Sequence, residues 1–320
     1  MALADDPLIG FAHAAYRLGE RFAARRTGLR FVEARTREEL ERILPDLDVL
    51  VVSGFWRNAF AARAPRLGFI QSISAGTEQF DPATLAARGI RLASAQGVNA
   101  EAVAQHGIAM MLAFARRLPE ALRNQDRRHW RGMSPDPALR EDTLSGKTLL
   151  VVGYGRIGSR LGQLARAFGM RVIGVRRDPA AGGAEADEIH GFGDLPALWS
   201  RADIVALTCA LTPETAGLVG EAALRSLRPG TGLVNLARGR VVDEPALLDA
   251  LRSGRLGWAA LDVFAEEPLP SEHPLWLMPN VLITPHCAGE FLGYEEGVID
   301  LLLENLRRLR RGDRLLNQIV

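Results

Sequence analysis

The stretch that decides the fold is LLVVGYGRIGSRLGQLARAFGMRVIGVR, residues 149–176. An apolar run of strand length leads into the pattern G-x-G-x-x-G. Apolar residues at helical spacing follow and stop at Gly169, and a second β-branched run completes the stretch. This order predicts a strand, a glycine turn, a helix and a parallel strand, which together form a βαβ unit.

Each glycine of this turn has a physical task. Gly153 permits the tight turn, Gly155 removes a side chain where a pyrophosphate would approach the backbone, and Gly158 lets helix and strand pack closely. The free N–H groups at the start of the helix face an anion. The turn therefore predicts a dinucleotide site. A plain glycine-rich turn of an α/β fold, or a turn serving another nucleotide-like ligand, stays open as the alternative. The cofactor-binding residues predicted here are Gly153, Tyr154, Gly155, Arg156, Ile157 and Gly158.

Length and composition narrow the class of protein. A chain of 320 residues suits two domains of ordinary size. With 39 basic and 38 acidic side chains, no strong attraction to nucleic acid or to an anionic membrane is expected. No apolar stretch reaches the roughly 18 residues that span a bilayer, and the first residues lack the pattern of a secretion signal. The cysteines, Cys209 and Cys287, predict neither a disulfide framework nor a metal site, and they favour a cytoplasmic location.

Upstream of the glycine turn, short apolar runs alternate with helical patterns. Residues 8–24 read as a helix, so the strand that usually opens an α/β domain is missing. Thr36 and Glu39 form a capping box for a short helix, and Asn99 is expected to cap a long apolar helix over 100–117. Strands are expected over 29–33, 47–53, 67–73 and 90–94, which together describe a small doubly wound domain.

Downstream of the glycine turn the alternation continues. Strands are expected over 204–209, 232–236, 258–263 and 281–284, and helices from Thr212 and over 244–252 and 289–311. In open parallel sheets, ligands bind beyond the carboxyl ends of the strands. The residues that could bind a ligand, most of them glycine, cysteine or charged, lie just after expected strands, which argues for one shared crevice. They are Gly54, Ala75, Gly76, the glycine turn, Arg176, Cys209, Arg238, Asp262 and His286.

Three of the downstream polar residues could perform chemistry. Arg238 can bind a carboxylate through two parallel hydrogen bonds. His286 can pass a proton to or from an alcohol or carbonyl oxygen, and a carboxylate such as Glu267 can orient a histidine and favour its imidazolium form. Taken singly, each is more often a surface or structural residue, and their spacing alone does not bring them together.

The chain resembles the D-isomer-specific 2-hydroxyacid dehydrogenase family, which also contains glyoxylate/hydroxypyruvate reductases and phosphoglycerate dehydrogenases. The resemblance covers nearly the whole chain from about residue 45. Its carriers are SAGTEQFD (74–81), GVN (97–99), VAQH (103–106), GYGRIG (153–158), LTPET (211–215), NLARGRVVDE (235–244), LDVFAEEP (261–268), HPLW (273–276) and TPHCAG (284–289). Together these motifs are highly specific.

The resemblance implies roles for the candidate catalytic residues. His286 would be the acid/base that protonates the carbonyl oxygen during reduction, and Glu267 would pair with it and keep the proton available. Arg238 would hold the carboxylate and carbonyl oxygen of the substrate. The reaction implied is hydride transfer between a nicotinamide and a 2-oxo or 2-hydroxy acid, with glyoxylate or hydroxypyruvate as the expected small substrate. Charge that builds on the carbonyl oxygen would be neutralised by these side chains.

The resemblance also implies binding residues. The backbone N–H groups of Ala75 and Gly76 would bind the substrate carboxylate, with Gly54 nearby, and Asp262 would orient the nicotinamide amide with help from the backbone near Ala237. The other cofactor contacts expected are Cys209, Ala210, Thr215 and Gly289, where a small buried core residue is the alternative for Cys209.

The residues after the second strand of the βαβ unit bear on which dinucleotide binds. Family members that use NAD carry an acidic residue there, which holds the ribose 2′-hydroxyl. This chain has Arg176 and Arg177, and Asp178 only after them. Two guanidiniums would bind a 2′-phosphate, so NADP is the expected cofactor. The alternative is that Asp178 bends back and serves NAD.

The predicted architecture is α/β with two doubly wound parallel-sheet domains, a Rossmann cofactor domain inserted into a flavodoxin-like substrate domain. The substrate domain is expected to comprise 1–97 and 287–320, and the cofactor domain 98–286. The family is usually dimeric, which implies a homodimer that packs through 100–145. A non-enzymatic alternative also exists, because some relatives are corepressors that use the nucleotide as a sensed ligand.

Overall fold

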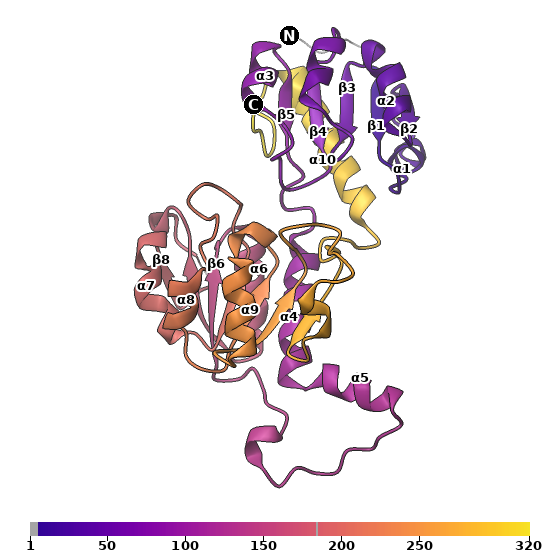
Figure 1. Cartoon of the computed structure of the whole chain (residues 1–320). Coiled ribbons are helices and arrows are strands. Elements are labelled where there is room, and N and C mark those ends of the chain that lie inside the picture. The colour runs from indigo at the N-terminus through magenta and orange to yellow at the C-terminus, as the bar shows by residue number, and fades with distance from the viewer. Residues whose placement is uncertain (1–5, 184) are drawn as a thin grey trace. The chain divides into compact units, whose positions relative to one another are not determined.

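In the computed structural model, residues 6–183 and 185–320 are described. The first residues, on which the absence of a secretion signal was predicted, therefore lie outside the described part. The chain divides into two compact units. Unit 1 is Met1–Asn99 with Phe291–Val320, and unit 2 is Ala100–Glu290. Both ends of the chain thus belong to unit 1, as the colours of Figure 1 show.

Unit 1 is a five-stranded parallel sheet in the order β2-β1-β3-β4-β5, which is the flavodoxin-like order. Its central strand β3 is apolar on both faces because helices cover both. The strands are β1 (Ile9–Ala12), β2 (Phe31–Ala34), β3 (Val49–Val52), β4 (Phe69–Ser72) and β5 (Arg91–Ala93). The helices are α1 (Leu18–Ala24), α2 (Arg37–Ile43), α3 (Pro82–Ala87) and α10 (Tyr294–Arg311).

The terminal helix α10 closes the core of unit 1. It begins at Tyr294 and not at 289 as predicted. Its side chains Val298, Leu302 and Leu306 are buried in the cluster that contains Phe11 from β1. The returning tail therefore completes the first domain, which explains why the ends of the chain fold together.

Three predictions for individual elements are wrong. Residues 8–24 are not one helix, because Ile9–Ala12 form strand β1 and α1 begins only at Leu18. A central parallel strand is apolar on both faces, so its run cannot be told from a buried helix by periodicity. The Asn99 side-chain oxygen has no hydrogen-bond partner, so it does not cap α4. Residues 213–217 form a turn and not the start of a helix.

Unit 2 is a seven-stranded parallel sheet in the order β12-β11-β10-β9-β6-β7-β8. Its strands are β6 (Thr148–Val152), β7 (Arg171–Val175), β8 (Glu188–His190), β9 (Ile204–Leu207), β10 (Thr231–Asn235), β11 (Leu256–Leu261) and β12 (Val281–Ile283). Its helices are α4 (Ala100–Ala115), α5 (Leu118–Asp126), α6 (Arg156–Ala167), α7 (Leu195–Leu198), α8 (Glu221–Ser226) and α9 (Glu244–Arg252).

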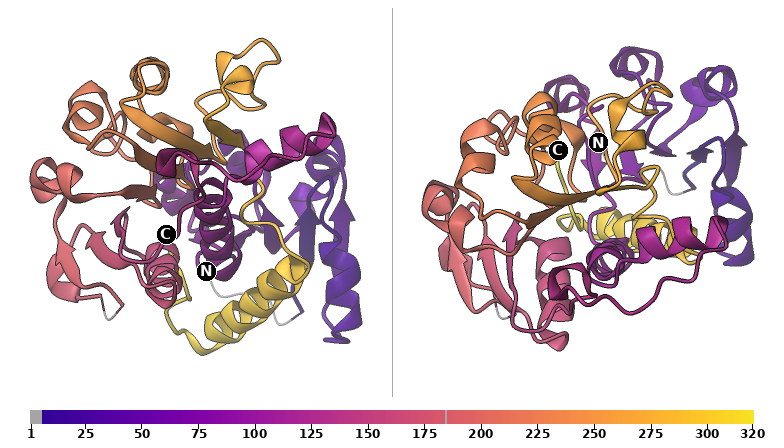
Figure 2. Two further views of the ribbon diagram at one scale, coloured as in Figure 1. Left: turned by 90° about the horizontal axis from the view of Figure 1, so that it is seen from below. Right: turned by 60° about the horizontal axis from the view of Figure 1, so that its bottom comes forward.

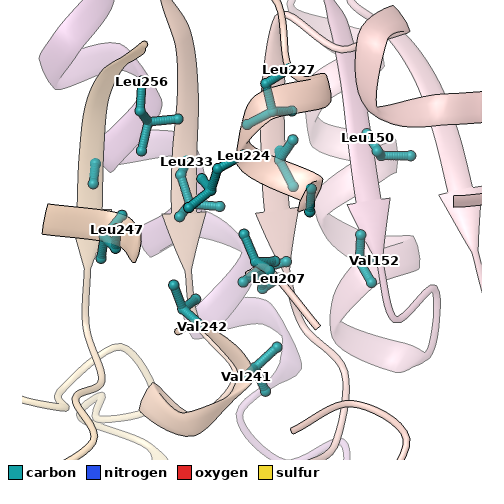
Figure 3. Packing of buried hydrophobic residues seen from close by; sticks show 14 of the residues in the cluster. Leu150, Val152, Leu207, Leu224, Leu227, Leu233, Val241, Val242, Leu247 and Leu256 are labelled. Atoms are coloured by element: carbon teal, nitrogen blue, oxygen red, sulfur yellow. The ribbon is translucent and has the colours of Figure 1, made fainter. Parts of the chain in front are cut away.

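Strand β6 shows that this sheet has a core on each face. Leu150 and Val152 point into the cluster shown in Figure 3, which α8 and α9 cover with Leu224 and Leu247. The intervening Leu149 and Val151 belong to a second cluster with side chains of α4 and α6. The alternation of side chains along a strand therefore buries both faces, as in a doubly wound sheet.

The order of the strands creates a switch point between β6 and β9. The chain runs outward from β6 through β7 to β8, and then returns to the other side of β6 with β9. In a doubly wound sheet, a ligand crevice is expected beyond the carboxyl ends of the two strands at such a switch point. The glycine turn follows β6, and Cys209 follows β9.

Helix α5 and the irregular segment after it extend away from the sheet of unit 2, as Figures 1 and 2 show. Several large apolar side chains of this segment are exposed, among them Trp130 at 94% and Met133 at 99%. Among the described residues, no helix is long and apolar enough to cross a bilayer.

Candidate active site

The glycine turn has the geometry that its sequence predicts. Gly153 has φ +100°, and a Cβ there would lie 2.3 Å from the backbone nitrogen of Cys209. A Cβ on Gly158 would lie 2.5 Å from the carbonyl oxygen of Gly153, so only glycine lets α6 approach β6 this closely. At Gly155 the nearest atom would be 4.0 Å away, which leaves open space above the N-terminus of α6. An anion can reach the first N–H groups of the helix there.

Tyr154 lies in the same turn, but its ring is buried in the core. A Cβ on Gly162 of α6 or Gly174 of β7 would collide with the ring, so both glycines make room for it. Its hydroxyl has no hydrogen-bond partner, and burial raises the pKa of Tyr154 to about 12. Only the backbone of Tyr154 can therefore contribute to ligand binding.

The loop after β9 is held by a threonine. The buried hydroxyl of Thr215 donates to the carbonyl oxygen of Ala210 at 2.7 Å and accepts from the N–H of Thr212 at 2.8 Å. Cys209 is buried beside the glycine turn, and burial raises the pKa of its thiol to about 11. Thr215 therefore fixes the shape of this loop. The Cys209 thiol stays neutral and presents only a small surface.

Two arginines directly follow β7, the strand next to β6 in the sheet. The guanidinium of Arg176 donates one hydrogen bond to the carbonyl oxygen of Gly182, and Arg177 is exposed. The carboxylate of Asp178 accepts from the N–H of Ala180 at 3.1 Å and caps a short turn. Asp178 is thus engaged by its own turn, while the guanidinium of Arg176 has further donors.

The candidate catalytic residues follow three neighbouring strands. Asn235, Leu261 and Ile283 lie side by side at the ends of β10, β11 and β12. Arg238 follows the first of these strands, Glu267 the second and His286 the third. The parallel register therefore brings to one edge of the sheet three segments that are far apart in the sequence.

Asn235 shapes the turn that presents Arg238, and sequence reasoning missed it. Its buried side chain donates to the carbonyl oxygen of Arg238 at 3.1 Å and accepts from the N–H of Ala237 at 3.0 Å. The Arg238 guanidinium donates to the carbonyl oxygen of Ala237 at 2.7 Å. A buried asparagine at the end of an apolar strand is the signal that could have identified this role.

His286 and Glu267 form a direct pair. The Nδ1 atom of His286 lies 2.7 Å from Oε2 of Glu267, and Oε1 of Glu267 accepts from the N–H of Phe264 at 2.9 Å. Because an ionised carboxylate can only accept, Nδ1 carries a proton and Nε2 is the ring nitrogen left for a ligand. The His286 side chain is 48% exposed, so this nitrogen is accessible.

Asp262 is buried and accepts three hydrogen bonds from the segment around His286. Its Oδ1 accepts from the Thr284 hydroxyl at 2.6 Å and from the N–H of Cys287 at 3.0 Å, and its Oδ2 accepts from the N–H of Ala288 at 3.1 Å. The Nε2 atom of His106 on α4 lies 3.1 Å from the same hydroxyl. Thr284 and His106 lie in motifs that carry the family resemblance, but neither was predicted as a site residue.

Unit 1 has its own polar edge, beyond the carboxyl ends of β3 and β4. Gly54 follows β3, and Ala75 and Gly76 follow β4. Three residues that the sequence analysis did not select as site residues connect these loops. The hydroxyl of Ser53 lies 2.7 Å from that of Ser74, and Gln79 donates to Ser53 at 2.9 Å. These bonds fix the backbone whose N–H groups were predicted to bind a carboxylate.

The fold and the site indicate the class of protein to which the chain belongs. Unit 2 is a doubly wound dinucleotide-type domain with a glycine turn at its switch point and a histidine–carboxylate pair at its edge. The family model described as "D-isomer specific 2-hydroxyacid dehydrogenase, NAD binding domain" matches residues 108–288. The chain belongs to the D-isomer specific 2-hydroxyacid dehydrogenase family. The resemblance and the fold class predicted from the sequence are thus confirmed.

Similar proteins include enzymes of different names. D-3-phosphoglycerate dehydrogenase of Methanocaldococcus jannaschii is 33% identical over 87% of this chain and 52% of its own length. The chain therefore spans about half the length of that relative. Glyoxylate reductase of Thermococcus gammatolerans is 34% identical over 87% of this chain and 84% of its own. A D-isomer specific 2-hydroxyacid dehydrogenase from Xanthobacter autotrophicus, solved with NADPH and MES, is 29% identical with a TM-score of 0.81, covering 98% of each chain.

Proposed function

We propose that this protein transfers a hydride between a nicotinamide dinucleotide and a small 2-oxo or 2-hydroxy acid. The observation that carries the proposal is the pair of His286 Nδ1 and Glu267 Oε2 at 2.7 Å, on the sheet edge that also presents Arg238. The glycine turn fits a dinucleotide because Gly155 leaves space above the N-terminus of α6. A bound nicotinamide would supply the hydride.

The side chains of the chain perform the remaining steps. In reduction, Nε2 of His286 donates a proton to the carbonyl oxygen of the substrate, and in oxidation it accepts the proton of the hydroxyl. Glu267 holds the ring in one orientation and stabilises positive charge on it. Arg238 binds the carboxylate and faces the carbonyl oxygen, where negative charge develops. The N–H groups of Ala75 and Gly76 in unit 1 are proposed as carboxylate-binding groups, as the resemblance to the family implies.

Glyoxylate and hydroxypyruvate are the substrates we propose. Their support is the similarity to glyoxylate reductases over most of both chains. The test is consumption of NADPH and NADH with a panel of 2-oxo acids, for the wild type and for His286→Ala. We expect turnover with the smallest acids and a loss of at least about a hundredfold in kcat for the variant, with cofactor affinity retained. Cofactor binding without turnover of any acid would instead favour the nucleotide-sensing alternative.

We propose NADP as the preferred cofactor. The support is the pair Arg176 and Arg177 after β7, the engagement of Asp178 with Ala180, and the similar Xanthobacter autotrophicus protein, which was solved with NADPH. The guanidiniums bind the 2′-phosphate that a carboxylate would repel. We expect kcat/KM for NADPH to exceed that for NADH, and the double variant Arg176→Ser, Arg177→Ser to lose most of that ratio. A wild-type ratio below one would contradict the proposal.

We also propose a homodimer that packs through the segment 100–145. Its support is the exposed apolar surface of Leu122, Trp130 and Met133 on and after α5. Light scattering should give twice the chain mass for the wild type, and Trp130→Asp with Met133→Asp should shift it to the monomer. The matched control is Leu277→Asp, because Leu277 is 89% exposed outside this segment.

A cytoplasmic location remains our expectation from the free cysteines.

A further inference from the structure

We propose that Thr284, oriented by His106, is a positioning residue for His286. Its hydroxyl secures the buried carboxylate of Asp262, and Asp262 in turn holds the backbone just after His286. The inference rests on the proposed function, in which Nε2 of His286 moves the proton. It adds to that function a set of residues that never touch the substrate.

The protons available on the side chains of Thr284, Asp262 and His106 determine which group donates in each hydrogen bond among them. The Thr284 hydroxyl has one proton, and Asp262 can only accept, so the bond of 2.6 Å uses that proton. The hydroxyl must then accept from His106, whose Nε2 lies at 3.1 Å and therefore carries a hydrogen. A single hydroxyl thus connects helix α4 to the carboxylate. Its one proton is used in the bond to Asp262, and one of its two lone pairs accepts from His106.

The carboxylate passes this constraint to the turn of His286. The N–H groups of Cys287 and Ala288 both donate to Asp262. His286 itself has φ +53°, in the left-handed region that a non-glycine residue rarely adopts. Such a backbone persists when surrounding bonds over-determine it. The two N–H bonds to Asp262 provide that restraint immediately after the residue.

The restraint matters because, apart from the hydrogen bond from the Phe264 N–H to Glu267, the pair of His286 with Glu267 has little support. Both side chains are substantially exposed, at 48% and 35%, so packing alone does not hold them. Asp262 is 2% exposed and directly follows β11. The Thr284 hydroxyl therefore links an exposed acid/base to the buried frame of the sheet. A misplacement of the acid/base by even 1 Å is costly to catalysis.

The experiment compares Thr284→Val with Thr284→Ser. Valine keeps the shape of threonine but removes the hydroxyl, and serine keeps the hydroxyl. The control is Thr231→Val at the other end of the sheet, where the hydroxyl of a buried threonine donates to the carbonyl oxygen of Arg228 at 2.7 Å. Two quantities are measured: kcat and KM for the 2-oxo acid, and the hydrogen-exchange rates of the Cys287 and Ala288 amides.

We expect Thr284→Val to lower kcat about tenfold, the fold-change equivalent to one charge-assisted hydrogen bond, with KM changed much less. The two amides should exchange faster in that variant. Thr284→Ser should restore both quantities, and Thr231→Val should leave both unchanged even where it lowers the melting temperature. These results would support a positioning role.

Two outcomes would overturn the inference. In the first, Thr284→Val keeps wild-type kcat and amide protection. In the second, serine impairs the protein as much as valine, which would show that keeping the hydroxyl does not preserve the position of His286. If the wild type reduces no 2-oxo acid, the proposed function fails, but amide exchange at Cys287 and Ala288 still decides whether the hydroxyl holds this turn.

Discussion

Gly155→Ala is expected to separate ligand binding from folding. The added methyl group would meet no atom nearer than the Gly153 carbonyl oxygen at 4.0 Å. The backbone there has φ −95°, which alanine can adopt. Alanine lowers the entropy of the unfolded chain but is a poorer N-cap than glycine, so these effects offset each other. We expect the free energy of unfolding to change by less than about 1 kcal/mol.

The same methyl group occupies the space above the N-terminus of α6. A pyrophosphate displaced from there would lose charge-assisted hydrogen bonds to backbone N–H groups, each worth about 1.5–3 kcal/mol. Losing one of these bonds raises the dissociation constant for NADPH at least about tenfold. Gly155→Ala should therefore bind cofactor weakly while it melts like the wild type.

Gly158→Ala is the matched comparison, because it lies on the same turn but faces the protein. Its Cβ would lie 2.5 Å from the Gly153 carbonyl oxygen and 2.9 Å from the Thr208 hydroxyl. A backbone oxygen cannot move aside, so we expect a cost of about 1–3 kcal/mol. For a domain of this size, each kcal/mol lowers the melting temperature by about 2–4 °C.

The assay is titration calorimetry with NADPH together with thermal unfolding of the three proteins without cofactor. The reasoning predicts opposite patterns, with affinity lost at Gly155 and stability lost at Gly158. If Gly155→Ala bound NADPH as tightly as the wild type, the pyrophosphate would not lie at this turn. If it melted several degrees lower, the space seen in the structure would not exist in solution.

The other predictions concern the catalytic pair, an ion pair on β8 and a buried thiol. Glu267→Gln should lower kcat by a factor of about 10²–10⁴, as is expected for His286→Ala, with NADPH affinity kept in a binding titration. Hydrogen bonding, from Arg201 above all, lowers the pKa of Glu188 from 4.5 to about 2. The ionised pair therefore stabilises the fold fully above pH 4.5, and this stabilisation is lost as the pH falls through 2. Glu188→Gln should cost about 1 kcal/mol at neutral pH in urea unfolding and much less at pH 2. Burial raises the pKa of Cys209 to about 11, so iodoacetamide at pH 8 should label this thiol slowly in the folded chain and rapidly in guanidinium.

Each of these has a result that would contradict it. A Glu267→Gln enzyme with wild-type kcat would remove the carboxylate from the mechanism. A difference between Glu188→Gln and wild type that persists in full at pH 2 would show that the ion pair is not its source. Labelling of folded Cys209 as fast as that of a free thiol would show that its site is open to water.

The local elements that short-range chemistry controls were predicted well. Glycine spacing predicted the turn at Gly153, where φ is positive and a Cβ has no room. The capping box of Thr36 and Glu39 is formed, and α9 has its predicted bounds, Glu244–Arg252. In these places the residues that decide the conformation are within a few positions of one another. The first strand was missed because a strand buried on both faces has no alternation to read.

The amino-acid order alone determined the βαβ unit, the family and the candidate residues after each strand, because these depend on contacts within one supersecondary unit. Only the tertiary structure decided which of the candidates act together. Glu267 and His286 meet because β11 and β12 are paired in register. Hydrogen bonds also join Asp262 at a strand end, Thr284 in a loop and His106 on a helix more than 150 positions earlier in the sequence. A local sequence pattern cannot predict contacts between residues so far apart in the chain.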